Sequence, residues 1–139
     1  MPKSGAEKIG VRAGSTLTLV NAPGGDTAVL GQLPANVVVT ASGGAADLPQ
    51  DAGAADVVLL FVADAAELAR HAPALFAAAG PDAATKLWIA YRKGKASDLG
   101  RDTLMPAFAD LGWHGVTLVS LDETWSAGRF RRLEDIKRR

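Results

Sequence analysis

Four short apolar runs constrain the fold of this chain more than any other feature of its sequence. They are rich in β-branched residues and extend from Thr16 to Val20, Val37 to Thr40, Val57 to Val62 and Leu87 to Tyr91. Three of the runs are nearly continuous rather than alternating in polarity, which is typical of parallel strands that are buried on both faces. The sequence therefore predicts a mostly parallel sheet inside an α/β domain.

Helical and hairpin patterns complete the expected elements. Residues Asp64 to Ala79 have helical periodicity, with a candidate N-cap at Asp64 and Glu67 three residues later. A second helix is predicted around Thr103 to Leu111. Two further strands, Gly115 to Leu121 and Trp125 to Arg132, are joined by only three residues, so we expect an antiparallel hairpin.

Composition bounds the class of protein. The 139 residues suit a single domain that spans residues 1–139, and fifteen basic residues balance fifteen acidic ones. This balance gives no overall field that would favour nucleic acid or an anionic membrane. The absence of cysteine excludes disulfides. No apolar run is long enough for a signal peptide or a membrane span, so we expect a cytoplasmic protein without a membrane partner.

The order of these elements resembles the Rossmann-like fold of S-adenosylmethionine-dependent methyltransferases. In that fold the first strand ends in a glycine-rich turn, which Asn21 to Gly25 match here, and Ala77 to Trp88 resembles the segment before a later central strand. The resemblance implies a three-layer sheet of about six strands in the order 2-1-3-4-6-5, numbered along the chain. It also implies that a helix–strand–helix unit has been deleted within Ser42 to Ala55.

The chain is also similar to a small bacterial family that is described only as a domain of unknown function. The motifs that carry this similarity are a "KIGVRAG" opening, a "NAP" turn, the apolar "LWIAYRKGKASDL" and "SLDETWSAGRF", all between Lys8 and Phe130. The family has no established activity. The similarity therefore supports the fold and leaves the mechanism open.

Polar residues follow several of the predicted strands. Open α/β sheets bind ligands beyond the carboxyl ends of their strands, so we expect the site at that edge. The candidate cofactor-binding residues are Asn21, Gly24, Gly25, Asp64 and Tyr91, and the candidate ligand-binding residues are Arg92, Lys93, Asp122, Glu123 and Trp125.

The standard contacts for an adenosyl cofactor are weakened in this sequence. Such a site needs glycines where the backbone approaches the ligand and an acidic residue after the second strand. Here Pro23 interrupts the turn, and the first acid after the second strand is Asp47. We therefore expect no cofactor, with S-adenosylmethionine left as an open alternative. His71 and His114 have no second ligand at metal spacing, so no metal site is predicted.

These observations favour a non-catalytic ligand-binding or interaction module on a degenerate methyltransferase-like scaffold. One alternative is a small methyltransferase with an altered cofactor site. A second alternative is an RNA-associated protein that uses the cations of Arg92 to Lys95 and Arg129 to Arg132, although the charge balance disfavours nucleic acid. The partner would be a small molecule or a protein, and the sequence leaves open whether catalysis or homodimerisation occurs.

Overall fold

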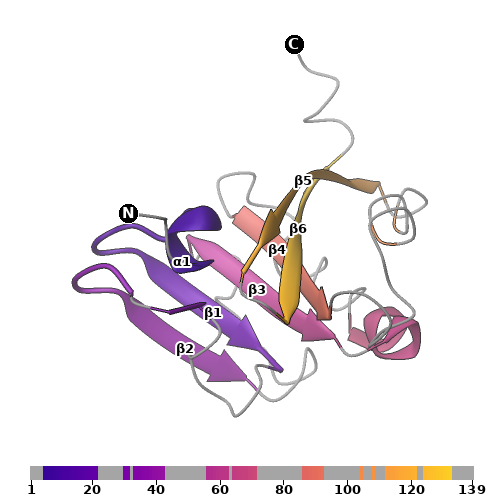
Figure 1. Cartoon of the computed structure of the whole chain (residues 1–139), viewed down its shortest axis with the longest axis horizontal. Helices are drawn as coiled ribbons and strands as arrows, with labels where there is room; N and C mark the ends of the chain where they lie inside the picture. Colours follow the sequence, from indigo (N-terminus) through magenta and orange to yellow (C-terminus); the bar gives the residue numbers. More distant parts are fainter. Residues whose placement is uncertain are drawn as a thin grey trace.

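Six strands form one mixed sheet in the computed structural model of this protein (Figure 1). The structure describes residues 5–21, 30–31, 33–42, 56–62, 64–71, 86–92, 104, 108, 112–121 and 124–132. The strands are β1 (Thr16–Val20), β2 (Val38–Ser42), β3 (Val57–Val62), β4 (Lys86–Arg92), β5 (Trp113–Ser120) and β6 (Trp125–Arg132). Their order across the sheet is β2-β1-β3-β4-β6-β5.

The strand directions follow from the pairing. β1 is parallel to both β2 and β3, and β3 is parallel to β4. β6 is antiparallel to both β4 and β5, so it runs against all the other strands. The predicted strand order and the predicted C-terminal hairpin are confirmed. The carboxyl ends of β1 to β5 consequently lie at one edge of the sheet, together with the start of β6.

The predicted three-layer, Rossmann-like and methyltransferase-like fold class is wrong. The described part of the chain is mostly strand, with only two short helices, α1 (Gly5–Lys8) and the helical segment 65–71. A three-layer α/β fold needs a layer of full helices on each face. Continuous apolar strands require that both faces be covered, but they do not require that the cover be helical. Among the described residues the cover comes from α1, the helical segment 65–71 and single residues such as Leu30 and Leu104.

The two predicted helices are described only in part. Residues 65–71 form the start of the expected Asp64 to Ala79 helix, and the remainder lies outside the described residues. Leu104 is helical, but most of Thr103 to Leu111 also lies outside them. No helix in the described ranges is long and apolar enough to cross a membrane.

Each face of the sheet carries a hydrophobic cluster. β3 is buried along its whole length because alternate residues serve opposite clusters: Val58, Leu60 and Val62 on one face, and Val57, Leu59 and Phe61 on the other. Leu68 and Phe108 belong to the first cluster, and Ala6 and Ile9 to the second. This division explains why the third apolar run shows no alternation.

The short helix α1 covers the second face near the amino ends of β1 and β3 (Figure 1). It approaches the neighbouring backbone closely. A Cβ atom on Gly5 would lie 3.2 Å from both the Cα of Leu30 and the carbonyl oxygen of Leu121. This contact fixes the segment that follows α1, and that segment forms part of the site described next.

Candidate functional site

The carboxyl edge of the sheet is where the sequence predicts a site. Asn21 directly follows β1, Asp64 follows β3, Arg92 ends β4 and Trp125 begins β6. The Arg92 guanidinium carbon lies 5.4 Å from the ring centroid of Trp125, its register partner. The other predicted residues, Gly24, Gly25, Lys93, Asp122 and Glu123, lie outside the described residues.

Asn21 and Asp64 are connected through Glu67. The Asn21 side-chain amide donates hydrogen bonds to the carbonyl oxygen of Phe61, at 3.0 Å, and to Oε1 of Glu67, at 2.5 Å. The Glu67 backbone N–H donates to Oδ1 of Asp64 at 2.8 Å, which is the N-cap arrangement expected from the sequence. The three residues thus join the end of β1 to the beginning of the helical segment 65–71.

Two other predicted site residues lie in the core. Tyr91 is 5% exposed and belongs to the first hydrophobic cluster. Trp125 is 7% exposed and packs edge-to-face against Phe61, with ring centroids 5.1 Å apart. The structure therefore gives internal packing partners to both aromatic residues, and their ligand roles stay predictions.

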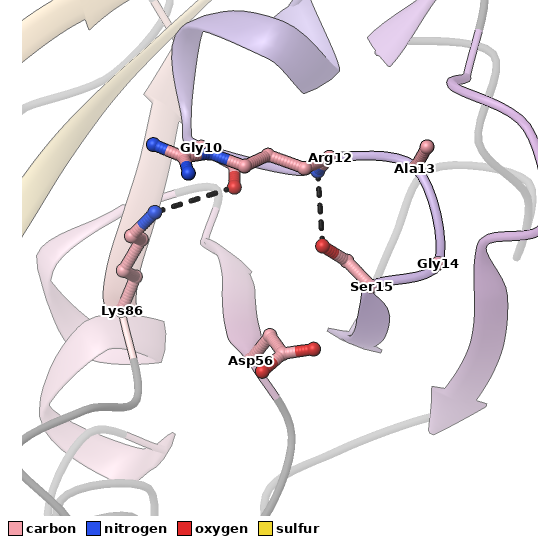
Figure 2. Close-up of a pocket in the computed structure, with 7 residues that line it drawn as sticks. All are labelled: Gly10, Arg12, Ala13, Gly14, Ser15, Asp56 and Lys86. Atoms are coloured by element: carbon pink, nitrogen blue, oxygen red, sulfur yellow. Dashed lines mark hydrogen bonds between the residues drawn. The ribbon is translucent and has the colours of Figure 1, made fainter.

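A pocket of about 370 Å³ opens at the opposite edge, where β1, β3 and β4 begin (Figure 2). Its surface is mostly polar. The residues that line it are Gly10, Arg12, Ala13, Gly14, Ser15, Asp56 and Lys86. Five of the seven come from the segment between α1 and β1, so the geometry of that segment determines the shape of the pocket.

A glycine-dependent turn forms the rim of the pocket. The Ser15 N–H donates to the Arg12 carbonyl oxygen at 2.9 Å, and Gly14 has a φ of 80°. A positive φ at the third position of such a turn is the type II geometry, which favours glycine. The Ser15 hydroxyl also accepts the Arg12 N–H at 3.0 Å, so the turn that carries Arg12 is closed by two hydrogen bonds.

Gly10 ends α1 and makes room for Lys86. The Gly10 N–H donates to the Glu7 carbonyl oxygen at 3.1 Å and the Val11 N–H to that of Ala6 at 3.0 Å, a Schellman motif with Gly10 at a φ of 92°. A Cβ atom on Gly10 would lie 2.7 Å from Nζ of Lys86. Nζ itself donates to the Gly10 carbonyl oxygen at 3.4 Å (Figure 2). A side chain at position 10 would therefore displace the Lys86 ammonium.

Asp56 and Thr16 hold the starts of the strands together. The Thr16 N–H donates to Oδ2 of Asp56 at 3.0 Å, and the Thr16 hydroxyl accepts the Asp56 N–H at 2.9 Å. The Lys86 N–H donates to the Asp56 carbonyl oxygen at 2.9 Å. These bonds place one carboxylate, Asp56, and one cation, Lys86, on neighbouring strands at the mouth of the pocket.

The charges that line the pocket favour an anion. Arg12 is exposed and Lys86 is half-buried, and in the part of the chain that the structure describes neither cation forms an ion pair with a carboxylate. In Figure 2 the Arg12 guanidinium and the Lys86 ammonium lie on the same side of the view. Among the described residues, no group of three or more His, Asp or Glu side chains is placed to hold a metal ion.

Sequence reasoning missed the residues of this pocket. Its signal was present in the motif "KIGVRAG", whose two glycines are separated by Val11, Arg12 and Ala13. The positive φ of both glycines explains the spacing. The predicted site lay at the carboxyl edge, as is usual for open α/β sheets, and this rule directed attention away from the amino edge.

No protein-family model matches the chain, and no curated protein matches it either. The similarity to a small bacterial family therefore stays a prediction.

Proposed function

We propose that this protein is a non-catalytic binding module whose amino-edge pocket takes a small ligand with an oxyanion group, either a phosphate or a carboxylate. The observation that carries the proposal is the presence of Arg12 and Lys86 at one pocket with no described carboxylate in ion-pair contact with them. Charge-assisted hydrogen bonds from arginine and lysine are the usual means of holding such groups.

The size and preorganisation of the pocket support this proposal. A volume of about 370 Å³ falls within the range of small-molecule sites. The turn that carries Arg12 is already closed by hydrogen bonds, and Gly10 already leaves space for Lys86. Binding would then cost little conformational entropy, which increases affinity for a given set of contacts.

The polar groups around the two cations have structural partners. Asp56 accepts hydrogen bonds from Thr16, and Ser15 accepts one from the Arg12 N–H. These bonds position the strand ends and the turn, so we assign the residues a supporting role in binding. The same proposal extends to proteins that share the "KIGVRAG" opening, because that motif supplies four of the seven lining residues.

The test is calorimetric titration with inorganic phosphate and with acetate at low ionic strength. We expect the variants Lys86→Met and Arg12→Gln each to weaken binding by about tenfold, which corresponds to about 1.4 kcal/mol. Methionine preserves the aliphatic chain that packs against Gly10. The matched control is Arg70→Gln, which removes an exposed cation from the helical segment 65–71.

Two results would contradict the proposal. The first is that the unmodified protein binds neither phosphate nor acetate. The second is an equal loss of affinity in the Arg70→Gln control, since that would indicate a general effect of net charge.

A further inference from the structure

Two buried N–H groups without an acceptor lie side by side on neighbouring strands. They are Nε1 of Trp88 and Nε of Arg129. Trp88 in β4 and Arg129 in β6 are direct register partners, so their side chains are on the same face of the sheet, with Cβ atoms about 4.5–5.5 Å apart. Buried donors in proteins are nearly always paired, and a pair of unmatched donors at one position requires an explanation.

These donors are on the same face as the amino-edge pocket. Lys86 precedes Trp88 by two residues in β4, and residues at this spacing in a strand share a face. Trp88 also packs in the cluster that contains Ala6, within α1, and Ile9, directly after it. Trp88 therefore follows the pocket residue Lys86 on one face of β4, and Arg129 lies beside Trp88 on β6.

A second cation, Arg131, lies near Arg129, and no described carboxylate pairs with either of them. Arg131 shares the face of Arg129 and lies two residues farther along β6, towards the start of β4, because the two strands are antiparallel. The pKa of Arg129 is lowered, first by burial of its guanidinium and second by the charge of Arg131. In the described ranges neither arginine has a carboxylate partner. A bound anion would offset the repulsion between Arg129 and Arg131 and would accept hydrogen bonds from the unmatched donors.

The chemistry of the arginine side chain defines how this anion would bind. An oxyanion that binds a guanidinium side-on accepts from Nε and from one terminal nitrogen. The Nε of Arg129 has no hydrogen-bond partner, and the indole N–H of Trp88 adds a further donor beside it. Both donor atoms are buried in this structure, so an oxyanion would reach them only after the Arg129 side chain moves outward.

We propose that Trp88 and Arg129 form a second oxyanion subsite that continues the amino-edge pocket, so that the natural ligand is a small molecule with two oxyanion groups. Arg12 and Lys86 hold one group, and Arg129 and Trp88 hold the other. Lys86 and Arg129 are diagonal cross-strand neighbours, with Cβ atoms about 7–8 Å apart. The two groups of the ligand are therefore separated by several bonds. This inference rests on the proposed function and adds the class of ligand.

The experiment compares ligands that have one group or two. The probes are inorganic phosphate, fructose 6-phosphate, fructose 1,6-bisphosphate, acetate and glutarate, each titrated by calorimetry into the full chain. We expect the bisphosphate or glutarate to bind at least about tenfold more tightly than the corresponding probe with one group, fructose 6-phosphate or acetate. Tighter binding of fructose 1,6-bisphosphate would indicate a bisphosphate ligand, and tighter binding of glutarate would indicate a dicarboxylate.

Substitutions at Arg129 and Trp88 test whether the second oxyanion group of the ligand binds there. Arg129→Gln and Trp88→Phe should each remove the preference for two groups and should reduce the affinity for inorganic phosphate less than Lys86→Met does, because the Arg12–Lys86 subsite is intact. Phenylalanine preserves the packing of an aromatic ring and removes only the N–H donor. The bisphosphate should also change the tryptophan fluorescence of the unmodified protein and change it less in Trp88→Phe. Arg70→Gln is again the control.

The outcomes separate the two proposals. If inorganic phosphate binds but the two-group probes bind no more tightly, or if both variants retain the preference, the second subsite is wrong and the proposed function stands. If no probe binds the unmodified protein, the proposed function fails and the second subsite fails with it. If Arg129→Gln does not fold, the Trp88→Phe result decides the question.

Discussion

The two edges of the sheet secure their strand ends by different means. At the carboxyl edge, side chains bond to one another across elements, as Asn21 does to Glu67 and as Arg92 does to the ring of Trp125. At the amino edge Thr16 and Asp56 also bond to each other, but around the pocket glycines shape the backbone, and Lys86 meets a carbonyl oxygen at Gly10. The first arrangement engages polar side chains within the protein, and the second leaves cations beside an open pocket.

This difference bears on how a site is recognised. A polar residue at a strand end is equally conspicuous in the sequence whether it braces the fold or binds a ligand. The two roles differ in the partners that the tertiary structure supplies. We therefore expect substitutions at the carboxyl edge to change stability alone, and substitutions at the amino edge to change anion binding as well.

The largest effect is expected at Asn21, which has a φ of 60° and bonds to both Phe61 and Glu67. Asn21→Ala should lower the free energy of unfolding by about 3 kcal/mol, because it removes both bonds and places alanine in the left-handed region. Chemical denaturation measures this change. Asn21→Gly loses the same bonds without the backbone strain and should be about 1 kcal/mol more stable than Asn21→Ala. A loss of phosphate affinity in either variant would break the contrast between the edges.

At the amino edge, Gly10→Ala should cost about 2 kcal/mol, since alanine is strained at a φ of 92° and its Cβ collides with Lys86. The displaced ammonium should also reduce the affinity for inorganic phosphate several-fold, measured by calorimetry. Gly112→Ala is the matched control, with a φ of 86° and nothing within 4 Å of the new Cβ. It should show a smaller loss of stability, from backbone strain alone, and unchanged binding. Equal phosphate affinities in the two variants would count against a role for Lys86.

A smaller effect is expected for the N-cap of the helical segment 65–71. Asp64→Ala removes the acceptor of the Glu67 N–H and should lower the free energy of unfolding, measured by thermal denaturation, by about 1 kcal/mol. Asp64→Ser retains an acceptor and should recover most of this loss. Because the segment begins at the carboxyl edge, phosphate titrations should be indistinguishable from those of the unmodified protein, and a clear difference would show that the edges are coupled.

The smallest expected change is a gain. Asp56 contributes a negative charge to the pocket, so Asp56→Asn should increase phosphate affinity by about two- to fivefold at low ionic strength while an amide oxygen still accepts from Thr16. The gain should shrink in 0.15 M salt, which screens exposed charges beyond about 8 Å. Asp64→Asn, at the other edge, should give no gain. An unchanged affinity in Asp56→Asn would place the bound anion away from Asp56.

Much of the sheet could be predicted from local patterns. The bounds of β1 and β3 are those expected, because β-branched apolar residues that are buried on both faces produce an uninterrupted signal. β4 is one residue longer at each end than predicted, with Lys86 and Arg92, because polar ends carry no such signal. The helical layers were overpredicted. The apolar pattern of the strands indicates that both faces of the sheet are buried, but it does not indicate which kind of element covers them.

The sequence by itself determined which segments become strands and, through the resemblance, their order across the sheet. The tertiary structure alone decided which polar side chains find internal partners. Lys86 meets Gly10 across 76 positions of sequence, and Trp88 and Arg129 meet through strand pairing. Hydrophobic periodicity is a local property of the chain, whereas the partner of a charge or an N–H group is set by segments that only folding brings together.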